Sequence, residues 1–123
     1  MKLQLESATG LNAFTGYGEG YVVVNGQRID KSVVVLPERI LADWPARSFD
    51  GLAAEHLAIL AELGREIVLL GTGSRLRFPR AEVIAPLVRA GIGIEVMDIQ
   101  AACRTYNILM AEQRKVAAAL LIE

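Results

Sequence analysis

The spacing of hydrophobic and polar residues divides this chain into a first part with strand-like patterns and a second part in which strands and helices alternate. In the second part, short apolar runs predict buried strands, and apolar residues at helical spacing predict amphipathic helices. Two consecutive strand–helix–strand units favour parallel strands. The predicted strands are 67–70, 94–98 and 116–122, and the predicted helices are 52–63, 81–90 and 99–112. The last strand shows no alternation, which is typical of a strand covered by helices on both faces.

The first part carries the signals of antiparallel β-structure. The pair Asn25-Gly26 separates two β-prone runs, 21–24 and 27–29, and predicts a tight hairpin because both residues tolerate positive φ. A further strand ends at Pro37, which has no amide proton to donate. The fold class predicted from the whole pattern is therefore α/β, with parallel strand–helix–strand units and an N-terminal antiparallel β portion.

Polar, glycine and proline residues predict where the helices begin and end. Asp50 and Asp98 are predicted N-caps, and Gly64 is a predicted helix end because it tolerates a left-handed backbone. Pro86 conflicts with this pattern, because a proline inside a helix removes an internal hydrogen bond. The penultimate predicted helix therefore either starts after Ala81 or bends at the proline.

Length and composition indicate one domain over residues 1–123, with no linker and no internal repeat. The formal net charge of −1 excludes a globally basic nucleic-acid binder. A hydrophobic content of 53% and a mean hydropathy of +0.36 indicate either a well-filled core or an apolar surface that a second copy covers in a homodimer.

The single cysteine, Cys103, allows no intramolecular disulfide and fits a reducing compartment, so we predict a cytoplasmic protein. No apolar run has the length of a transmembrane helix, and the N-terminus lacks the pattern of a secretory signal. We therefore expect a soluble protein without membrane insertion.

The stretch Gly71-Thr72-Gly73-Ser74, at the end of a predicted buried strand, invites comparison with nucleotide-binding loops. A dinucleotide fingerprint would require glycine at Leu76 and a helix where Pro79 stands, and the Gly-Lys-Ser/Thr ending of a phosphate loop is absent. The sequence therefore predicts no nucleotide cofactor. The stretch fits either a tight turn or a pocket for a small anion.

The anion-pocket hypothesis rests on donors that could converge on one ligand at the strand-end edge, where open α/β folds usually bind ligands. Asp98 follows the neighbouring strand and could join this edge, or it could only cap its helix. The predicted ligand-binding residues are Gly71, Thr72, Gly73, Ser74, Arg75 and Asp98. Arg77 and Arg80, nearby, could instead contact an acidic protein partner.

Two aromatic residues are the remaining candidates for function. Trp44 is the only tryptophan, and it is either an apolar plug over the end of the core or an exposed anchor for a partner. His56 is the only histidine and has no cysteine or second histidine in register, so no metal site is predicted. No arrangement typical of a known class of catalytic site is present, and whether the chain is an enzyme stays open.

Three stretches together resemble one known family. They are Val33 to Trp44, Leu69 to Gly73, and Gly91 to Leu120. The chain resembles the small family of unknown function that includes a mitochondrial respiratory complex I assembly factor and a cytosolic adipogenesis-associated relative. The most specific part is the Arg104-Thr105-Tyr106-Asn107 segment with Glu112 and Arg114 after it.

The resemblance implies a three-layer α/β domain with a mixed sheet and an interaction or assembly role. Gln113 departs from the family pattern because glycine is usual there, and Pro86 is a second departure.

The sequence as a whole leaves two hypotheses for the function. The first is a non-enzymatic interaction or assembly module that uses Trp44, the Arg75–Arg80 segment or an apolar face. The second is a protein or enzyme that binds a small anionic ligand at the Gly71–Ser74 loop.

Overall fold

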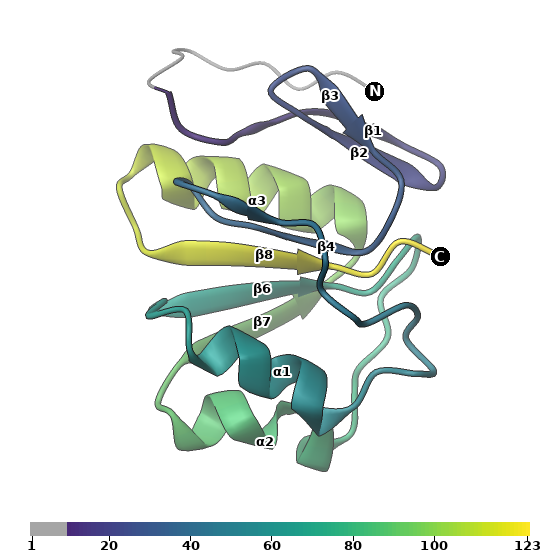
Figure 1. Cartoon of the computed structure of the whole chain (residues 1–123), viewed down its shortest axis with the longest axis vertical. Helices are drawn as coiled ribbons and strands as arrows, with labels where there is room; N and C mark the ends of the chain where they lie inside the picture. Colours follow the sequence, from purple (N-terminus) through teal and green to yellow (C-terminus); the bar gives the residue numbers. More distant parts are fainter. Residues whose placement is uncertain (1–9) are drawn as a thin grey trace.

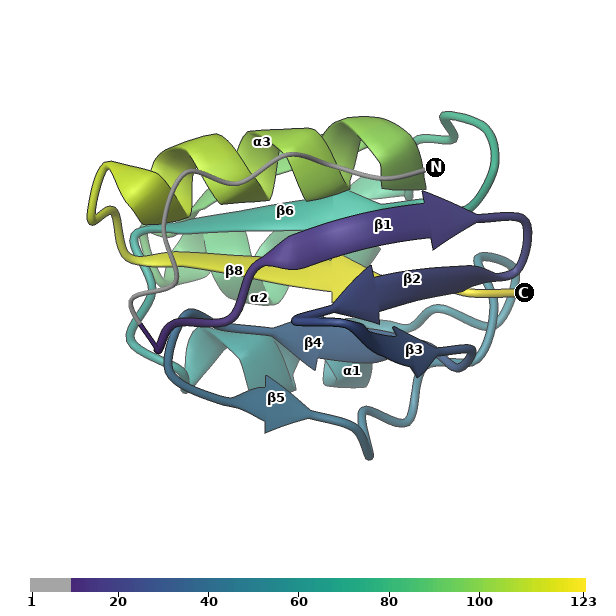
Figure 2. The same ribbon diagram turned by 90° about the horizontal axis from the view of Figure 1, so that it is seen from above.

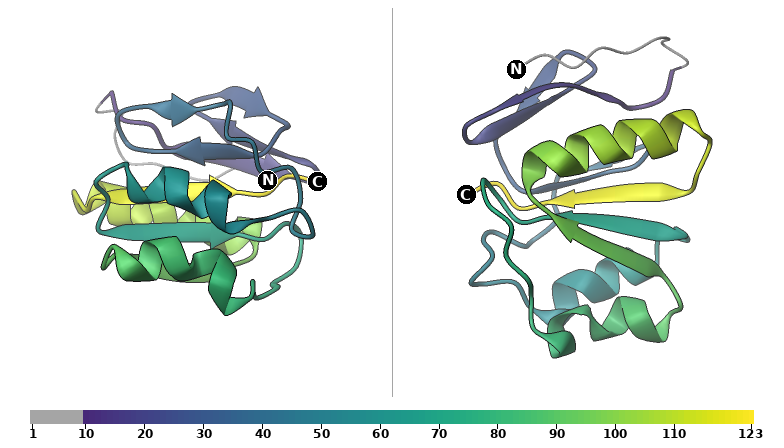
Figure 3. Two further views of the ribbon diagram at one scale, coloured as in Figure 1. Left: turned by 60° about the horizontal axis from the view of Figure 1, so that its bottom comes forward. Right: turned by 180° about the vertical axis from the view of Figure 1, so that it is seen from behind.

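Two β-sheets and three helices form three layers in the computed structural model, which describes residues 10–123 (Figure 1). A five-stranded sheet, which we call the central sheet, is the middle layer. Helix α3 and a three-stranded N-terminal sheet cover one face, and helices α1 and α2 cover the other (Figures 1 and 3). The elements in chain order are β1 (Phe14–Gly18), β2 (Tyr21–Val24), β3 (Gln27–Ile29), β4 (Val33–Val35), β5 (Ile40–Leu41), α1 (Ala54–Ala61), β6 (Ile67–Gly71), α2 (Ala81–Arg89), β7 (Gly93–Met97), α3 (Ile99–Ala111) and β8 (Val116–Leu120).

Strand β8 lies in the middle of the central sheet, whose order is β5-β4-β8-β6-β7. It pairs in parallel with β6 and antiparallel with β4, so the sheet is mixed. Every residue of β8 is buried, because Ala117 and Ala119 face the side of α1 and α2 while Ala118 faces α3 and the N-terminal sheet. The predictions of an α/β fold and of a last strand covered on both faces are confirmed.

The N-terminal sheet is an antiparallel meander that lies beside α3 (Figure 2). The predicted hairpin joins β2 to β3, with φ values of 49° at Asn25 and 82° at Gly26. Phe14 of β1 packs edge-on against Tyr106 of α3, with ring centroids 5.1 Å apart. The predicted antiparallel β portion therefore forms a separate sheet, which shares one core cluster with α3 and the central sheet.

Helix α1 starts later than predicted. Its N-cap is Ala53, and the imidazole Nδ1 of His56 accepts a hydrogen bond of 3.0 Å from the Ala53 amide. The prediction of Asp50 as the N-cap is wrong, because a turn closed by the Leu52 amide and the Phe49 carbonyl, at 3.1 Å, precedes the helix. His56 thus has a structural partner at the helix start.

The other predicted helix boundaries mostly hold. Gly64 follows α1 with a φ of 68°, and Asp98 caps α3 by accepting a hydrogen bond of 2.8 Å from the Ala101 amide. The alternative that α2 starts after Ala81 is wrong, because the helix includes both Ala81 and Pro86. The proline removes the donor that would bond to the carbonyl four residues earlier, that of Glu82, but it does not end the helix.

Trp44 belongs to the core on the side of α1 and α2. It is 5% exposed, and its indole nitrogen donates a hydrogen bond of 3.0 Å to the His56 carbonyl. The interpretation of Trp44 as an apolar plug is confirmed. The nearby strand β5 was not predicted, because two residues carry no measurable period.

Candidate functional site

The loop after β6 is bonded to the start of α3. Strands β6 and β7 are neighbours, but β6 leads to α2 on one face of the sheet and β7 leads to α3 on the other. Such diverging connections usually open a ligand crevice at the strand ends. Here they are joined by two backbone hydrogen bonds of 2.9 Å, from the Thr72 amide to the Met97 carbonyl and from the Ile99 amide to the Gly73 carbonyl.

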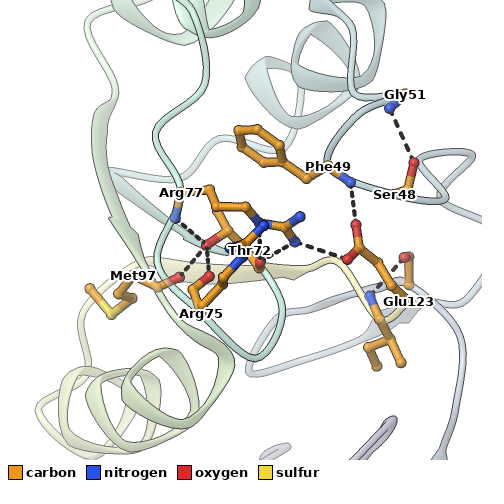
Figure 4. Close-up of polar contacts among 10 residues, drawn as sticks. Ser48, Phe49, Gly51, Thr72, Arg75, Arg77, Met97 and Glu123 are labelled. Carbon is orange, nitrogen blue, oxygen red and sulfur yellow. Dashed lines mark hydrogen bonds and ion pairs between the residues drawn. The ribbon is translucent and has the colours of Figure 1, made fainter.

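The Thr72 side chain holds the loop in place from inside. It is fully buried, and its hydroxyl donates a hydrogen bond of 2.8 Å to the Arg75 carbonyl (Figure 4). The same oxygen accepts a hydrogen bond of 3.0 Å from the Arg77 amide. The hydroxyl that the anion-pocket hypothesis assigned to a ligand therefore satisfies its own loop.

Arg77 turns back toward the protein and connects three segments (Figure 4). Its guanidinium donates to the Thr72 carbonyl at 2.6 Å and to the Glu123 carboxylate at 2.9 Å, and it lies 4.7 Å from the centre of the Phe49 ring. Glu123 also accepts a hydrogen bond of 2.6 Å from the Phe49 amide. This amide, followed by the hydrogen bond and charge of Arg77, lowers the pKa of Glu123 below its ordinary value of 4.5.

Two glycines of the loop lie where a side chain would have little room or a strained backbone. A Cβ at Gly71 would lie 2.7 Å from the Leu120 side chain and 3.3 Å from that of Ala102. Gly73 has a φ of 90°, and a Cβ there would lie 2.9 Å from the Arg77 guanidinium. Glycine at these positions therefore lets the loop pass between β8, α3 and Arg77.

A pocket of about 500 Å³ lies next to this loop. Gly73 and Ser74 contribute one wall, and the first turn of α3 contributes another. The turn between β1 and β2, including the exposed Glu19, and the chain after β8, including Glu123, complete the lining. The pocket is large enough for a small metabolite.

The Arg104–Asn107 segment of α3 attaches the N-terminal sheet. Asn107 makes a two-way pair with the backbone of Phe14, accepting from its amide at 2.9 Å and donating to its carbonyl at 2.8 Å. The Tyr106 hydroxyl donates a hydrogen bond of 2.9 Å to the Asn12 carbonyl. These side chains thus act as a substitute strand partner at the edge of the N-terminal sheet.

Two more contacts complete this structural role. Arg104 donates a hydrogen bond of 2.9 Å to the Tyr17 hydroxyl of β1. In the turn before β8, Arg114 forms an ion pair of 2.7 Å with Glu66. Its hydrogen bond, with that of the Lys115 amide, lowers the pKa of Glu66. Arg114 and Lys115 of this turn therefore both bond to the Glu66 carboxylate and tie the turn to the start of β6.

A family model described as "Protein of unknown function (DUF498/DUF598)" matches residues 14–121. The chain belongs to this family. The resemblance to a family of unknown function is therefore confirmed. The segment on which it rested most specifically, Arg104 to Asn107, attaches the N-terminal sheet to α3.

Two vertebrate relatives and one bacterial crystal structure are similar to this chain. The chain is 36% identical to NADH dehydrogenase [ubiquinone] 1 alpha subcomplex assembly factor 3 of Danio rerio, over 97% of this chain and 68% of that protein. It is 31% identical to the protein of the same name from Homo sapiens, over 97% of this chain and 65% of that protein. The chain thus spans about two thirds of these relatives. A crystal structure of a Bordetella parapertussis protein is 44% identical, with a TM-score of 0.86 over 95% of this chain and all of that one.

The structure separates the residues predicted to bind a ligand or a partner into three groups. Gly71, Thr72, Gly73 and Asp98 are committed to the loop and the helix cap. Ser74, Arg75 and Arg80 are exposed, and Arg80 forms an ion pair of 3.1 Å with the equally exposed Glu82. Trp44 is buried in the core, and Arg77 points inward.

Sequence reasoning missed Glu123 and Phe49, which complete the network around Arg77. No local pattern marks either residue, because they lie 46 and 28 positions away from Arg77 in sequence.

Within residues 10–123, no helix has the length and apolar character needed to cross a membrane. Across the same residues, no group of three or more His, Cys, Asp or Glu side chains is placed to hold a metal ion.

Proposed function

We propose that this chain is a non-enzymatic interaction module that binds a protein partner during the assembly of a larger complex. The observation that carries the proposal is the use of the polar groups at the strand-end edge. Thr72, Asp98 and Arg77 all bond to groups of the chain itself, so their geometry serves to hold the loop between β6 and α2 in one conformation.

The names of the relatives indicate which kind of protein the partner is. The matched vertebrate proteins are named as assembly factors of NADH dehydrogenase, so we propose that this chain contacts a subunit or another assembly factor of a respiratory NADH dehydrogenase. Arg80 is exposed on the loop and is a candidate contact. Arg77 supports the same contact indirectly, because it fixes the loop from inside. Trp44, with 5% exposure, could take part only if the partner reached the end of the core.

Affinity purification from native cells tests the proposal. A tagged chain should recover a stoichiometric protein partner, and that partner should belong to NADH dehydrogenase or its assembly. An untagged strain is the control for background. Recovery of the chain alone would contradict the interaction role, and a stoichiometric partner unrelated to NADH dehydrogenase would contradict the assembly role.

A small anionic ligand at the same edge is the second candidate function, for a binding protein or an enzyme. The pocket of about 500 Å³ beside Gly73 and Ser74 gives such a ligand room, and Arg75 is exposed next to Ser74, whereas the lining itself carries the carboxylates of Glu19 and Glu123. A ligand that binds only the folded state raises the melting temperature. Phosphate and small carboxylates should therefore raise it in the wild type and less in Ser74→Ala. No shift with any of these anions would contradict this candidate.

A further inference from the structure

The segment between the glycine loop and α2 exposes every second side chain. Leu76 is 48% exposed, Phe78 is 72% exposed, and the Arg80 side chain is 83% exposed, whereas Arg77 and Pro79 between them are partly buried. This alternation is that of an extended chain, which Pro79 favours at the residue before it. Leu76, Phe78 and Arg80 thus form a row on the surface, which we call the outward row.

The outward row is held by contacts beneath it. The Arg77 amide bonds to the Thr72 hydroxyl at 3.0 Å, and the Arg77 guanidinium bonds to Glu123 at 2.9 Å. The base of the segment is therefore fixed before any partner arrives. Binding by a prearranged segment loses less conformational freedom, and more of the contact energy becomes affinity.

Phe78 is the most exposed large hydrophobic residue in the part of the chain that the structure describes. The others range from 37% exposed at Leu11 to 60% at Val88. Phe78 adds nothing to either core cluster, so its exposed ring has no role in packing. Phenylalanine and arginine are both enriched in protein interfaces relative to the rest of the protein surface.

The positive charge around the outward row favours an acidic partner. Residues 74–80 contain three arginines and no acidic residue, and the ion pair of Arg80 with Glu82 is exposed to solvent on both sides. Exposed pairs of this kind exchange readily for others. We propose that the outward row binds an acidic segment of a partner protein, which covers Phe78 with apolar side chains and places carboxylates against Arg75 and Arg80. This inference rests on the proposed interaction role.

A protein partner fits the row better than an anionic membrane does. Polybasic membrane sites typically gather four to eight Lys or Arg residues, whereas only Arg75 and Arg80 point outward here. The formal charge of the whole chain, −1, would not add to such an attraction. The small apolar area of Leu76 and Phe78 also suits a single pocket or groove more than a lipid surface.

Site-specific photo-crosslinking in native cells tests the proposal with the full chain. Phe78→p-benzoylphenylalanine should crosslink to a protein whose crosslinked peptide is rich in Asp and Glu. The matched control is Val88→p-benzoylphenylalanine, because Val88 is 60% exposed on α2 and lies outside the row. The double substitution Arg75→Glu with Arg80→Glu should reduce the crosslink at position 78 about tenfold or more, because it sets like charges against each other.

Several outcomes would overturn the proposal. They are a neutral or basic crosslinked peptide, a crosslink to lipid or to a second copy of this chain, equal crosslinking at position 88, or none at position 78. Co-purification with Phe78→Ala separates the two proposals, since an exposed Phe is not needed for folding. A partner retained at wild-type yield by Phe78→Ala would reject the outward row and leave the interaction role intact. No partner for either protein would reject both.

Discussion

Gln113 is the residue at which the backbone conflicts most clearly with the side chain. It follows Glu112, the C-cap of α3, and has a φ of 65°. Its amide donates to the Met110 carbonyl and the amide of Arg114 donates to the Leu109 carbonyl, both at 2.9 Å, which is the pattern of a Schellman motif. That motif favours glycine at this position. Gln113, which stands where glycine is usual in the family, therefore has a left-handed backbone.

Gln113→Gly should stabilise the protein by about 0.5–1 kcal/mol, because relief of the left-handed strain outweighs the added freedom of glycine in the unfolded chain. The midpoint of urea unfolding measures the change. Glu112→Gly is the matched control, since Glu112 has a φ of −85° and gains nothing from glycine. Equal effects of the two substitutions would contradict the explanation.

Cys103 gives a second prediction at this scale. Burial raises the pKa of its thiol to about 12, and the charge of Asp98 adds to the shift while Arg104 opposes it. Because the thiolate is the reactive form, we expect almost no labelling by a disulfide reagent in the folded protein and one thiol per chain after denaturation. Rapid stoichiometric labelling under native conditions would show that the site opens.

Residue roles were predictable from the sequence where they depend on near neighbours. Asn25-Gly26 form the predicted turn because positive φ is a local property of these residues. The role of Thr72 was not predictable, because its amide bonds to Met97 and its hydroxyl closes its own loop. Asp50 failed as a predicted cap for a different reason, since the turn from Phe49 to Leu52 delays the helix to Ala53, whose amide bonds to His56.

The N-terminal sheet depends on α3 at the scale of whole elements. Asn107 supplies the hydrogen bonds that a further strand would give to Phe14, which is fully buried. Asn107→Ala leaves both backbone groups without these partners and should destabilise the sheet by about 2–3 kcal/mol. Hydrogen exchange should show faster exchange in β1 to β3, while β6 and β8 keep their protection.

Ile108→Ala is the control for that experiment. Ile108 is adjacent to Asn107 on α3 but is 59% exposed, so its truncation should leave exchange in β1 to β3 unchanged. Uniform loss of protection in both sheets of Asn107→Ala would show that the N-terminal sheet and the central sheet unfold as one unit.

The alternating strands and helices of the second half were predictable as elements, because each is long enough to show either a continuous apolar run or apolar residues at helical spacing. The two-residue β5 was not, and the sequence left open whether the N-terminal strands extend the main sheet or form a second layer; they form a separate sheet. Pairing of β4 with β8 joins Val33 to Leu120, and no local pattern encodes such a contact. The same holds for the candidate site. Its glycine loop was predictable from a local pattern, whereas Phe49 and Glu123, which contact Arg77 from distant segments, were not.

Across the whole molecule, Arg77 and Glu123 join the end of the chain to the loop after β6 and to the segment before α1. This network sets the position of the outward row relative to the rest of the protein. It should also be sensitive to acid, because the carboxylate at its centre accepts from both Phe49 and Arg77.

Glu123→Gln tests that dependence. The pKa of Glu123 in the folded protein is below its ordinary value of 4.5, so its ionised form stabilises the fold fully above that pH. The stabilisation is lost as the pH falls through the folded pKa, because the unfolded chain then binds the proton more readily. Urea unfolding from pH 7 to about pH 3 should therefore show the wild type more stable than Glu123→Gln at neutral pH, with the difference shrinking below pH 4.5. A difference that stays constant over this range would mean that the charge of Glu123 does not hold the network together.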